Sequence, residues 1–247
     1  MLVSRFGCSV VAFGFGLFIS QVSAAPMSIA EALADPTRPA EQLAVDAVRK
    51  PTEVLALSAI KAGDRVADVG PGGGYYTRLI SRMVGEGGKV YAFNPDWLLK
   101  MFPKAGDLSA TLAKTGYTNV EARSQPMAEL AFDDPLDVVF ISQLYHDQHW
   151  QKVDIAKMNV AIFRALKPGG VFVVIDHMAP AGTTDAQIDK LHRIDPDVVK
   201  REVKAAGFTL EVDSNLLANP ADPLSANVFD ASIKGRTSQF VLKFRKP

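Results

Sequence analysis

The sequence predicts an α/β protein, with a doubly wound, mostly parallel sheet and helices on both faces. Three observations lead to this fold class. Residues 66–74 read as a short buried strand and a glycine-rich turn, and a helix follows to about Val84. A second strand at 89–93 completes a βαβ unit within about 30 residues. Residues 136–141, apart from Asp137, and residues 171–175 are apolar, as central parallel strands are when both faces are covered.

The other elements are expected in the same alternation. Residues 40–48 read as a helix, and 51–60 as a second helix that Pro51 opens as its first-turn residue. Further helices are predicted at 108–114, 153–166 and 195–205, and further strands at 119–122, 208–212 and 239–244, of which the last two form a terminal pair. The segment 215–237 reads as a long loop, and such loops inside a compact domain are often functional or mobile.

Length and composition describe an ordinary globular chain. It has 247 residues, of which 48% are hydrophobic and 22% charged, enough for one large domain with a buried core. The formal charge is zero, so no basic surface for a nucleic-acid partner is expected. We interpret residues 25–50 as a helical N-terminal extension and 51–247 as one α/β domain, because no repeat or linker divides the chain.

Residues 1–24 read as a signal peptide. Arg5 precedes an apolar run at 6–19, and small residues lead to a break after Ala24. The run is shorter than the roughly 20 residues of a spanning helix, so cleavage is favoured over an uncleaved anchor. Processing would remove Cys8, the only cysteine, and so exclude disulfides, thiol catalysis and Cys-ligated zinc. We expect a secreted or periplasmic protein with no membrane span after processing.

The glycine turn after the first strand has three alternating glycines, Gly70, Gly72 and Gly74. Without Cβ atoms, they let the backbone pass close to a ligand, and the following helix offers unpaired N–H groups there. The dinucleotide spacing G-x-G-x-x-G is not met, because Tyr75 stands at its last glycine position. Asp68, two residues before the turn, would repel a pyrophosphate but suits a ligand with an ammonium or sulfonium group.

The pattern D-x-G-x-G-x-G after a strand resembles the first motif of class I S-adenosylmethionine-dependent methyltransferases. This superfamily has a Rossmann-like, seven-stranded sheet with a terminal antiparallel strand. Lys167-Pro168-Gly169-Gly170 before an apolar strand is similar to the entry into the fifth strand of the same superfamily. The resemblance extends from about residue 51 to the end. The continuation Gly74-Tyr75-Tyr76-Thr77 is similar to isoaspartyl protein methyltransferases, but it is too local to assign their substrate.

The resemblance implies S-adenosylmethionine as cofactor, held at the edge where the strands end at their carboxyl termini. Asp68 and the three glycines would hold its methionine part. The acidic residue that usually binds the ribose is replaced by Asn94, which hydrogen-bonds without a charge, and Asp96 could substitute only if the backbone turns suitably. Ser124 lies in the region that often contacts adenine. Ser142 opens the loop that would cover the methyl group.

That loop, residues 142–150, contains two of the four histidines, a carboxylate and two aromatic residues. We predict His146 and His149 as catalytic candidates, because either could take a proton from the acceptor as it attacks the methyl group. Alternatively, they cap the next helix and pack the loop, and alignment of the reactants alone suffices. No metal is expected. Although Asp147 and His177 are further candidate ligands, the histidine spacing is not that of zinc proteases and no H-E-x-x-H occurs.

The acceptor is left open, as a small molecule, a lipid or a protein. Two features favour a different class of function, a non-catalytic exported binding protein that retains the fold. The cofactor is made in the cytoplasm, and the predicted signal peptide would export the chain from that compartment. Asn94 also stands where a carboxylate is usual. A hydrolase that uses the histidines is disfavoured, because no G-x-S-x-G elbow is present.

Overall fold

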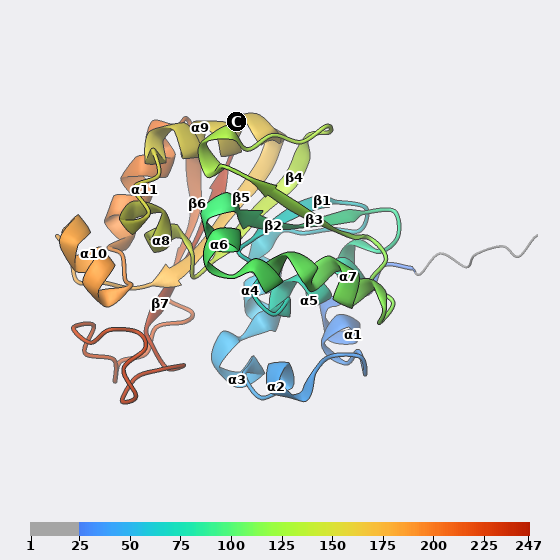
Figure 1. Cartoon of the computed structure of the whole chain (residues 1–247), viewed down its shortest axis with the longest axis horizontal. Helices are drawn as coiled ribbons and strands as arrows, with labels where there is room; N and C mark the ends of the chain where they lie inside the picture. The colour runs from blue at the N-terminus through green and yellow to red at the C-terminus, as the bar shows by residue number, and fades with distance from the viewer. Residues whose placement is uncertain (1–24) are drawn as a thin grey trace, which may run out of the picture.

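The computed structural model describes residues 25–247, so the predicted signal peptide lies outside the described residues. Seven strands form one sheet with helices on both faces (Figure 1). The strands are β1 (Arg65–Val69), β2 (Lys89–Pro95), β3 (Val120–Gln125), β4 (Leu136–Ser142), β5 (Leu166–His177), β6 (Thr209–Ser214) and β7 (Gln239–Arg245).

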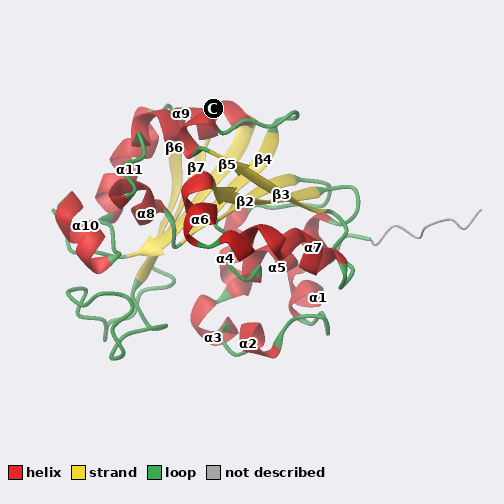
Figure 2. Ribbon diagram, in the orientation of Figure 1, coloured by secondary structure: helices red, strands yellow, loops and turns green. Residues whose placement is uncertain are grey.

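The helices fall between the strands and in the segment ahead of β1 (Figure 2). The α-helices are α1 (Ile29–Leu33), α2 (Ala40–Leu43), α3 (Asp46–Arg49), α4 (Pro51–Ser58), α5 (Tyr75–Val84), α6 (Asp96–Met101), α7 (Leu108–Ala113), α8 (Tyr145–Trp150), α9 (Ile155–Ala165), α10 (Asp185–Leu191) and α11 (Pro196–Ala205). Two short 3₁₀ helices are η1 (Pro103–Asp107) and η2 (Met127–Glu129). No helix among the described residues combines the length and apolar character needed to cross a bilayer.

The strand order is β3-β2-β1-β4-β5-β7-β6. The first five strands along the chain run parallel, and β7 lies antiparallel between β5 and β6. The predicted fold class is therefore confirmed, including the antiparallel strand. The order reverses between β1 and β4, and in open α/β sheets ligands bind outside the carboxyl ends of the strands at such a switch point.

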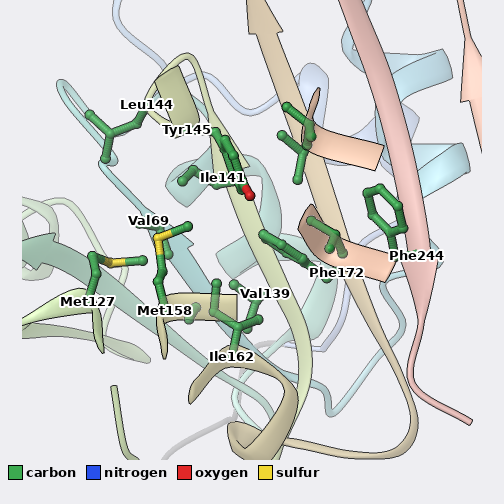
Figure 3. Packing of buried hydrophobic residues seen from close by; sticks show 14 of the residues in the cluster. Val69, Met127, Val139, Ile141, Leu144, Tyr145, Met158, Ile162, Phe172 and Phe244 are labelled. Atoms are coloured by element: carbon green, nitrogen blue, oxygen red, sulfur yellow. The ribbon is translucent and has the colours of Figure 1, made fainter. Parts of the chain in front are cut away.

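Alternation along the strands divides the core into two layers. Val66 and Phe140 face the layer under α1, α4, α5 and α7. Val139 faces the opposite layer under α8, α9, α10 and α11. Figure 3 shows this second layer, in which Met158 and Ile162 of α9 lie beside β4. Because both faces are buried, the inner strands carry the continuous apolar runs that predicted them.

Three short helices, α6, α8 and α10, were not predicted, and the expected helix at 40–48 is two helices, α2 and α3. These segments have few apolar residues at helical spacing. Leu43, Val45 and Val48 are exposed, so no continuous apolar face holds residues 40–48 as one helix. Contacts with neighbouring elements, rather than a periodic pattern, determine such short helices.

The predicted long loop is present, because residues 215–238 contain no helix or strand. A buried ion pair anchors it. The guanidinium of Arg193 donates to both carboxylate oxygens of Asp222, at 2.8 and 3.0 Å, and its Nε donates to the carbonyl of Ala226. Both charged side chains are fully buried. Asp222 also accepts from the backbone N–H of Ser238, so one carboxylate joins the start of the loop to its end.

We expect Arg193→Ala or Asp222→Ala to lower the free energy of unfolding by about 3–5 kcal/mol, because each leaves a buried charge without its partner. Urea denaturation measures the change. Lys157→Ala is the control, since its ion pair with Asp154 is exposed and should contribute nothing measurable. Equal effects of the Arg193 and Lys157 substitutions would contradict the anchoring role of the buried pair.

Candidate active site

A cavity of about 210 Å³ lies at the switch point between β1 and β4. We call it the switch-point cavity. The glycine turn forms one wall and the start of the loop after β4 forms another. Its lining residues are Arg49, Asp68, Gly70, Pro71, Gly72, Gly73, Tyr75, Tyr76, Ser142, Gln143 and Leu144. The structure thus brings together Asp68, Gly70, Gly72 and Ser142 of the predicted cofactor residues.

The glycines of the turn are required for different reasons. All three have positive φ angles, 69° at Gly70, 55° at Gly72 and 77° at Gly74. A Cβ on Gly70 would lie 2.5 Å from a methyl carbon of Leu144, so this glycine allows the loop after β4 to pack against β1. A Cβ on Gly72 would meet no described atom within 4 Å. The space beside Gly72 is therefore open for a ligand to approach the backbone.

Asp68 is a buried carboxylate at the base of the switch-point cavity. Its Oδ2 accepts a 2.6 Å hydrogen bond from the Thr77 hydroxyl, and only 2% of the residue is exposed. Burial raises its pKa to about 6, although the Thr77 hydrogen bond and the charge of Arg49 oppose the shift. Within residues 25–247, Asp68 forms no ion pair. The cavity therefore holds an acidic group that a bound cation would stabilise.

The N-terminal extension covers the glycine turn. Gln42 donates to the carbonyl of Gly73 at 3.0 Å, and the Tyr75 hydroxyl donates to Asp46 at 2.6 Å. The guanidinium of Arg49 lies 4.6 Å from the centre of the Tyr75 ring and lines the cavity. Sequence reasoning missed Arg49, because nothing in the extension resembles a cofactor motif.

The residues proposed for the ribose and adenine lie beside the cavity rather than in its lining. Asn94 is buried and donates to the carbonyl of Ala105 at 3.3 Å. Its Oδ1 is a buried acceptor without a hydrogen-bond partner in the described chain. The two other candidates bind each other, since the Ser124 hydroxyl donates to Asp96 at 2.6 Å.

His146 and His149 lie outside the lining of the switch-point cavity. His146 is buried, with Nδ1 2.7 Å from an Asp176 oxygen and Nε2 3.1 Å from an Asp147 oxygen. Burial opposes its protonation, but the two carboxylates outweigh this and raise its pKa to about 10. His149 lies 3.2 Å from Glu202, which raises its pKa against the effect of burial. These contacts support the structural alternative, and the catalytic assignment of both histidines stays a prediction.

A second cavity of about 190 Å³ shares Arg49 and Gln143 with the first. We call it the adjoining cavity. His177, at the end of β5, lines it, and its Nδ1 lies 2.7 Å from the Thr237 hydroxyl. Burial lowers the pKa of His177 to about 4, so the ring is neutral near pH 7. The remaining lining residues are Val45, Val48, Val228, Phe229, Lys234, Gly235, Thr237 and Gln239. The sequence analysis gave His177 a chemical role only as a candidate metal ligand. Its position at the carboxyl end of a strand nevertheless predicts that it lies at this edge of the sheet.

Comparisons with known proteins agree with this geometry. Residues 66–170 match the family model described as a methyltransferase domain. This stretch of the chain is therefore similar to the methyltransferase domains of S-adenosylmethionine-dependent enzymes. The glycine turn, β4 and the start of β5 all fall within the matched residues, as does the lining of the switch-point cavity except Arg49. These matches support the predicted superfamily, and they imply S-adenosylmethionine as the cofactor.

Individual relatives are distant. The chain is 24% identical over 161 residues to a protein-L-isoaspartate O-methyltransferase of Methanococcus aeolicus, and the match covers 63% of each chain. It is 31% identical over 127 residues to a ubiquinone/menaquinone biosynthesis C-methyltransferase of Proteus mirabilis, covering 51% of this chain and 47% of the relative. A methyltransferase structure from Aquifex aeolicus superposes with a TM-score of 0.57 at 19% identity, covering 90% of this chain and all of that one. The match to the first relative thus spans less than two thirds of its length.

The residues of the methyltransferase domain fit the cofactor. Asp68 provides a negative charge without a cationic partner, which suits the ammonium or sulfonium of S-adenosylmethionine. Arg49 provides a positive charge in the same cavity, which suits the carboxylate at the methionine end. The open space beside Gly72 admits a ligand against the backbone. The free Oδ1 of Asn94 would accept a hydrogen bond from a ribose hydroxyl.

We expect the affinity for S-adenosylmethionine to fall about tenfold between about pH 7 and about pH 5, because protonation of Asp68 removes the charge that attracts the cation. Calorimetric titration across this range measures the change. Asp68→Asn is the control, and its weaker binding should be almost independent of pH. An equally steep pH dependence in Asp68→Asn would assign the effect to another group.

Asp68→Asn should weaken cofactor binding, but it should not destabilise the ligand-free protein. Burial raises the folded-state pKa of Asp68 above its unfolded value of 3.8. The neutral carboxyl therefore contributes stability that is present below about pH 4 and is lost as the pH rises through about 6. Asp68→Asn should not show this loss. Its urea midpoint should equal or exceed that of the parent at neutral pH, which separates lost binding from lost folding.

Proposed function

We propose that the chain is an S-adenosylmethionine-dependent methyltransferase whose acceptor enters between α3 and the loop at 215–238. The observation that carries this proposal is the continuity of the cavities. The switch-point and adjoining cavities share Arg49 and Gln143. A third hollow of about 330 Å³ shares Val48 and Thr237 with the adjoining cavity. These neighbouring spaces would lead the acceptor from the surface to the cofactor position.

The chain's own residues would bind and orient the cofactor, which supplies an electrophilic methyl group. Asp68 and Arg49 would hold the two charges of its amino-acid end, and Asn94 would accept a hydrogen bond from the ribose. Gln143 lies in the lining of both cavities, where cofactor and acceptor would meet. In-line displacement depends on such alignment of nucleophile and methyl group.

The chemistry of the adjoining cavity suits an amphipathic acceptor. Val48 and Phe229 are exposed large apolar side chains in its lining, with exposed fractions of 45% and 64%. Arg49 and Lys234 add positive charge, which favours an acceptor oxygen that becomes an anion before it attacks. His177 is neutral and hydrogen-bonds Thr237, so its ring can orient such a hydroxyl by a hydrogen bond. Small phenols, quinols and lipids with a hydroxyl head combine these features.

The proposed site of action is outside the cytoplasm. The basic start, the apolar run and the small residues before Ala25 support an exported protein, as does a single cysteine within that leader. Intact-mass analysis of the exported protein should give a chain that begins at Ala25. Recovery of soluble protein that retains Met1 would contradict export by cleavage.

The second candidate is a non-catalytic binding protein that retains the fold. Asn94 favours it, because its amide bonds to Ala105 where relatives of the superfamily usually present a carboxylate to the ribose. This candidate predicts cofactor binding without methyl transfer. A screen of envelope lipids, quinols, phenols and proteins with methyl-labelled cofactor distinguishes the two functions.

We expect Gly72→Ala to weaken S-adenosylmethionine binding at least about tenfold, because the added methyl group occupies the space in which the ligand meets the backbone. Gly63→Ala is the matched control. Gly63 also has a positive φ, 82°, and a Cβ there likewise meets no described atom within 4 Å. Both variants should therefore lose similar stability, about 1–2 kcal/mol, but only Gly72→Ala should lose affinity. Equal affinities would exclude the glycine turn as the binding site.

Once the screen has identified an acceptor, we expect His177→Gln to lower kcat about tenfold with little change in cofactor affinity, because it removes the ring proposed to orient the acceptor hydroxyl. His149→Gln is the matched comparison, since His149 lies outside both cavity linings. A larger loss in His149→Gln than in His177→Gln would support the original assignment of His149 and contradict that of His177.

A further inference from the structure

A cluster of potential metal ligands lies beside the adjoining cavity and has no part in the proposed methyl transfer. It joins α8 to the end of α10, two helices that lie next to each other (Figure 1). Asp147 Oδ1 lies 3.1 Å from His146 Nε2 and 3.5 Å from His192 Nδ1. One ligand atom from each residue lies within 4.8 Å of the other two. We propose that His146, Asp147 and His192 bind a divalent transition-metal ion such as Zn²⁺.

The distances between these atoms suit one ion. Zinc binds imidazole nitrogen and carboxylate oxygen at about 2.0–2.2 Å, so neighbouring ligands of a tetrahedral ion lie roughly 3.3 Å apart. The two separations from Asp147, 3.1 and 3.5 Å, fall on either side of this value. Two imidazoles and one carboxylate are also a ligand set that zinc, cobalt and nickel accept. Three protein ligands leave at least one position for water or another ligand.

The surroundings of His146 orient it as a metal ligand. Its Nδ1 lies 2.7 Å from Asp176, a fully buried carboxylate. Asp176 is itself held by the backbone N–H groups of His146 and His177, at 2.8 and 2.7 Å. With Nδ1–H donated to Asp176, Nε2 points toward Asp147, and a bound ion would displace the proton that Nε2 shares with that carboxylate. A carboxylate behind the histidine is the usual outer partner of a metal-bound imidazole.

Asp147 keeps the capacity to bind an ion. The Trp150 indole N–H donates to its Oδ1 at 2.7 Å, and a carboxylate oxygen has a second lone pair for a metal. The ligand site therefore does not require the Trp150 hydrogen bond to break.

The third ligand occupies an unusual backbone position. His192 ends α10 with φ 53° and ψ 48°, a left-handed conformation that glycine adopts without strain. Its ring lies 5.6 Å from that of His146 and 5.1 Å from that of Phe229. Phe229 and His177 both line the adjoining cavity. A bound ion would thus connect α8 and α10 behind this wall of the cavity.

The inference revises the sequence-based expectation that no metal binds. That expectation rested on the spacing of His146 and His149, but His149 instead contacts Glu202. His192 is distant in sequence and reaches the site only through the packing of α10 on α8. A metal-free cluster of hydrogen-bonded histidines is the competing explanation of the same contacts.

The test is a titration of untagged, chelator-treated mature protein with Co²⁺ and Zn²⁺. Co²⁺ bound to nitrogen and oxygen ligands is followed by its visible absorption, and Zn²⁺ by calorimetry and thermal melting. We expect one equivalent to bind and the melting temperature to rise with Zn²⁺ concentration. No binding of either ion, with no shift in melting temperature, would overturn the proposal.

His192→Gly separates a ligand role from a structural one. Glycine suits the left-handed backbone, so the variant should melt in chelator at nearly the temperature of the parent. Its affinity for Co²⁺ should nevertheless fall at least about tenfold. His149→Gln is the control from α8, the helix that carries the two other ligands, and it should retain one equivalent of Co²⁺. Unchanged Co²⁺ affinity in His192→Gly, or equal losses in both variants, would overturn the assigned site.

Discussion

The burial of one carboxylate, Asp68, is the constraint on which the rest of the site depends. β1 carries it to the switch point of the sheet, where hydrogen bonding to Thr77 and the charge of Arg49 compensate only part of its desolvation. A buried carboxylate without a charged partner destabilises the ligand-free fold above its pKa, and such groups are common where a ligand supplies the missing charge. The positive φ angles of the glycine turn keep the space beside it open. Local stability and ligand binding are therefore opposed at this position.

The elements outside the sheet give the site its walls. The N-terminal helices place Arg49 between the two cavities, and the loop at 215–238 forms the outer side of the adjoining cavity. This loop has no regular structure, yet the buried pair of Arg193 and Asp222 ties it to the segment between α10 and α11. A rigid sheet edge thus carries the residues predicted to hold the cofactor, while surrounding segments shape the space proposed for the acceptor. Enzymes of this fold vary in function through such segments.

Much of the fold could be predicted because the inner strands are buried on both faces and the glycine turn has a specific spacing. Both features can be recognised in short stretches of the sequence. The short helix α8 could not be predicted, since contacts to Asp176 and Glu202 hold its polar side chains. The same limit applies to the site. Asp68 and Gly72 belong to a local motif, whereas Arg49 and His177 join them only through tertiary packing.

The central claim is that the switch-point cavity holds the charged methionine end of S-adenosylmethionine. Calorimetric titration of the mature protein with S-adenosylmethionine, S-adenosylhomocysteine and methylthioadenosine tests it most directly, because methylthioadenosine lacks the ammonium and carboxylate groups. With Asp68 and Arg49 in the cavity, the first two ligands should bind with one site per chain, and methylthioadenosine should bind at least about tenfold more weakly than S-adenosylhomocysteine. Equal affinity for all three, or no binding of S-adenosylmethionine, would contradict the claim.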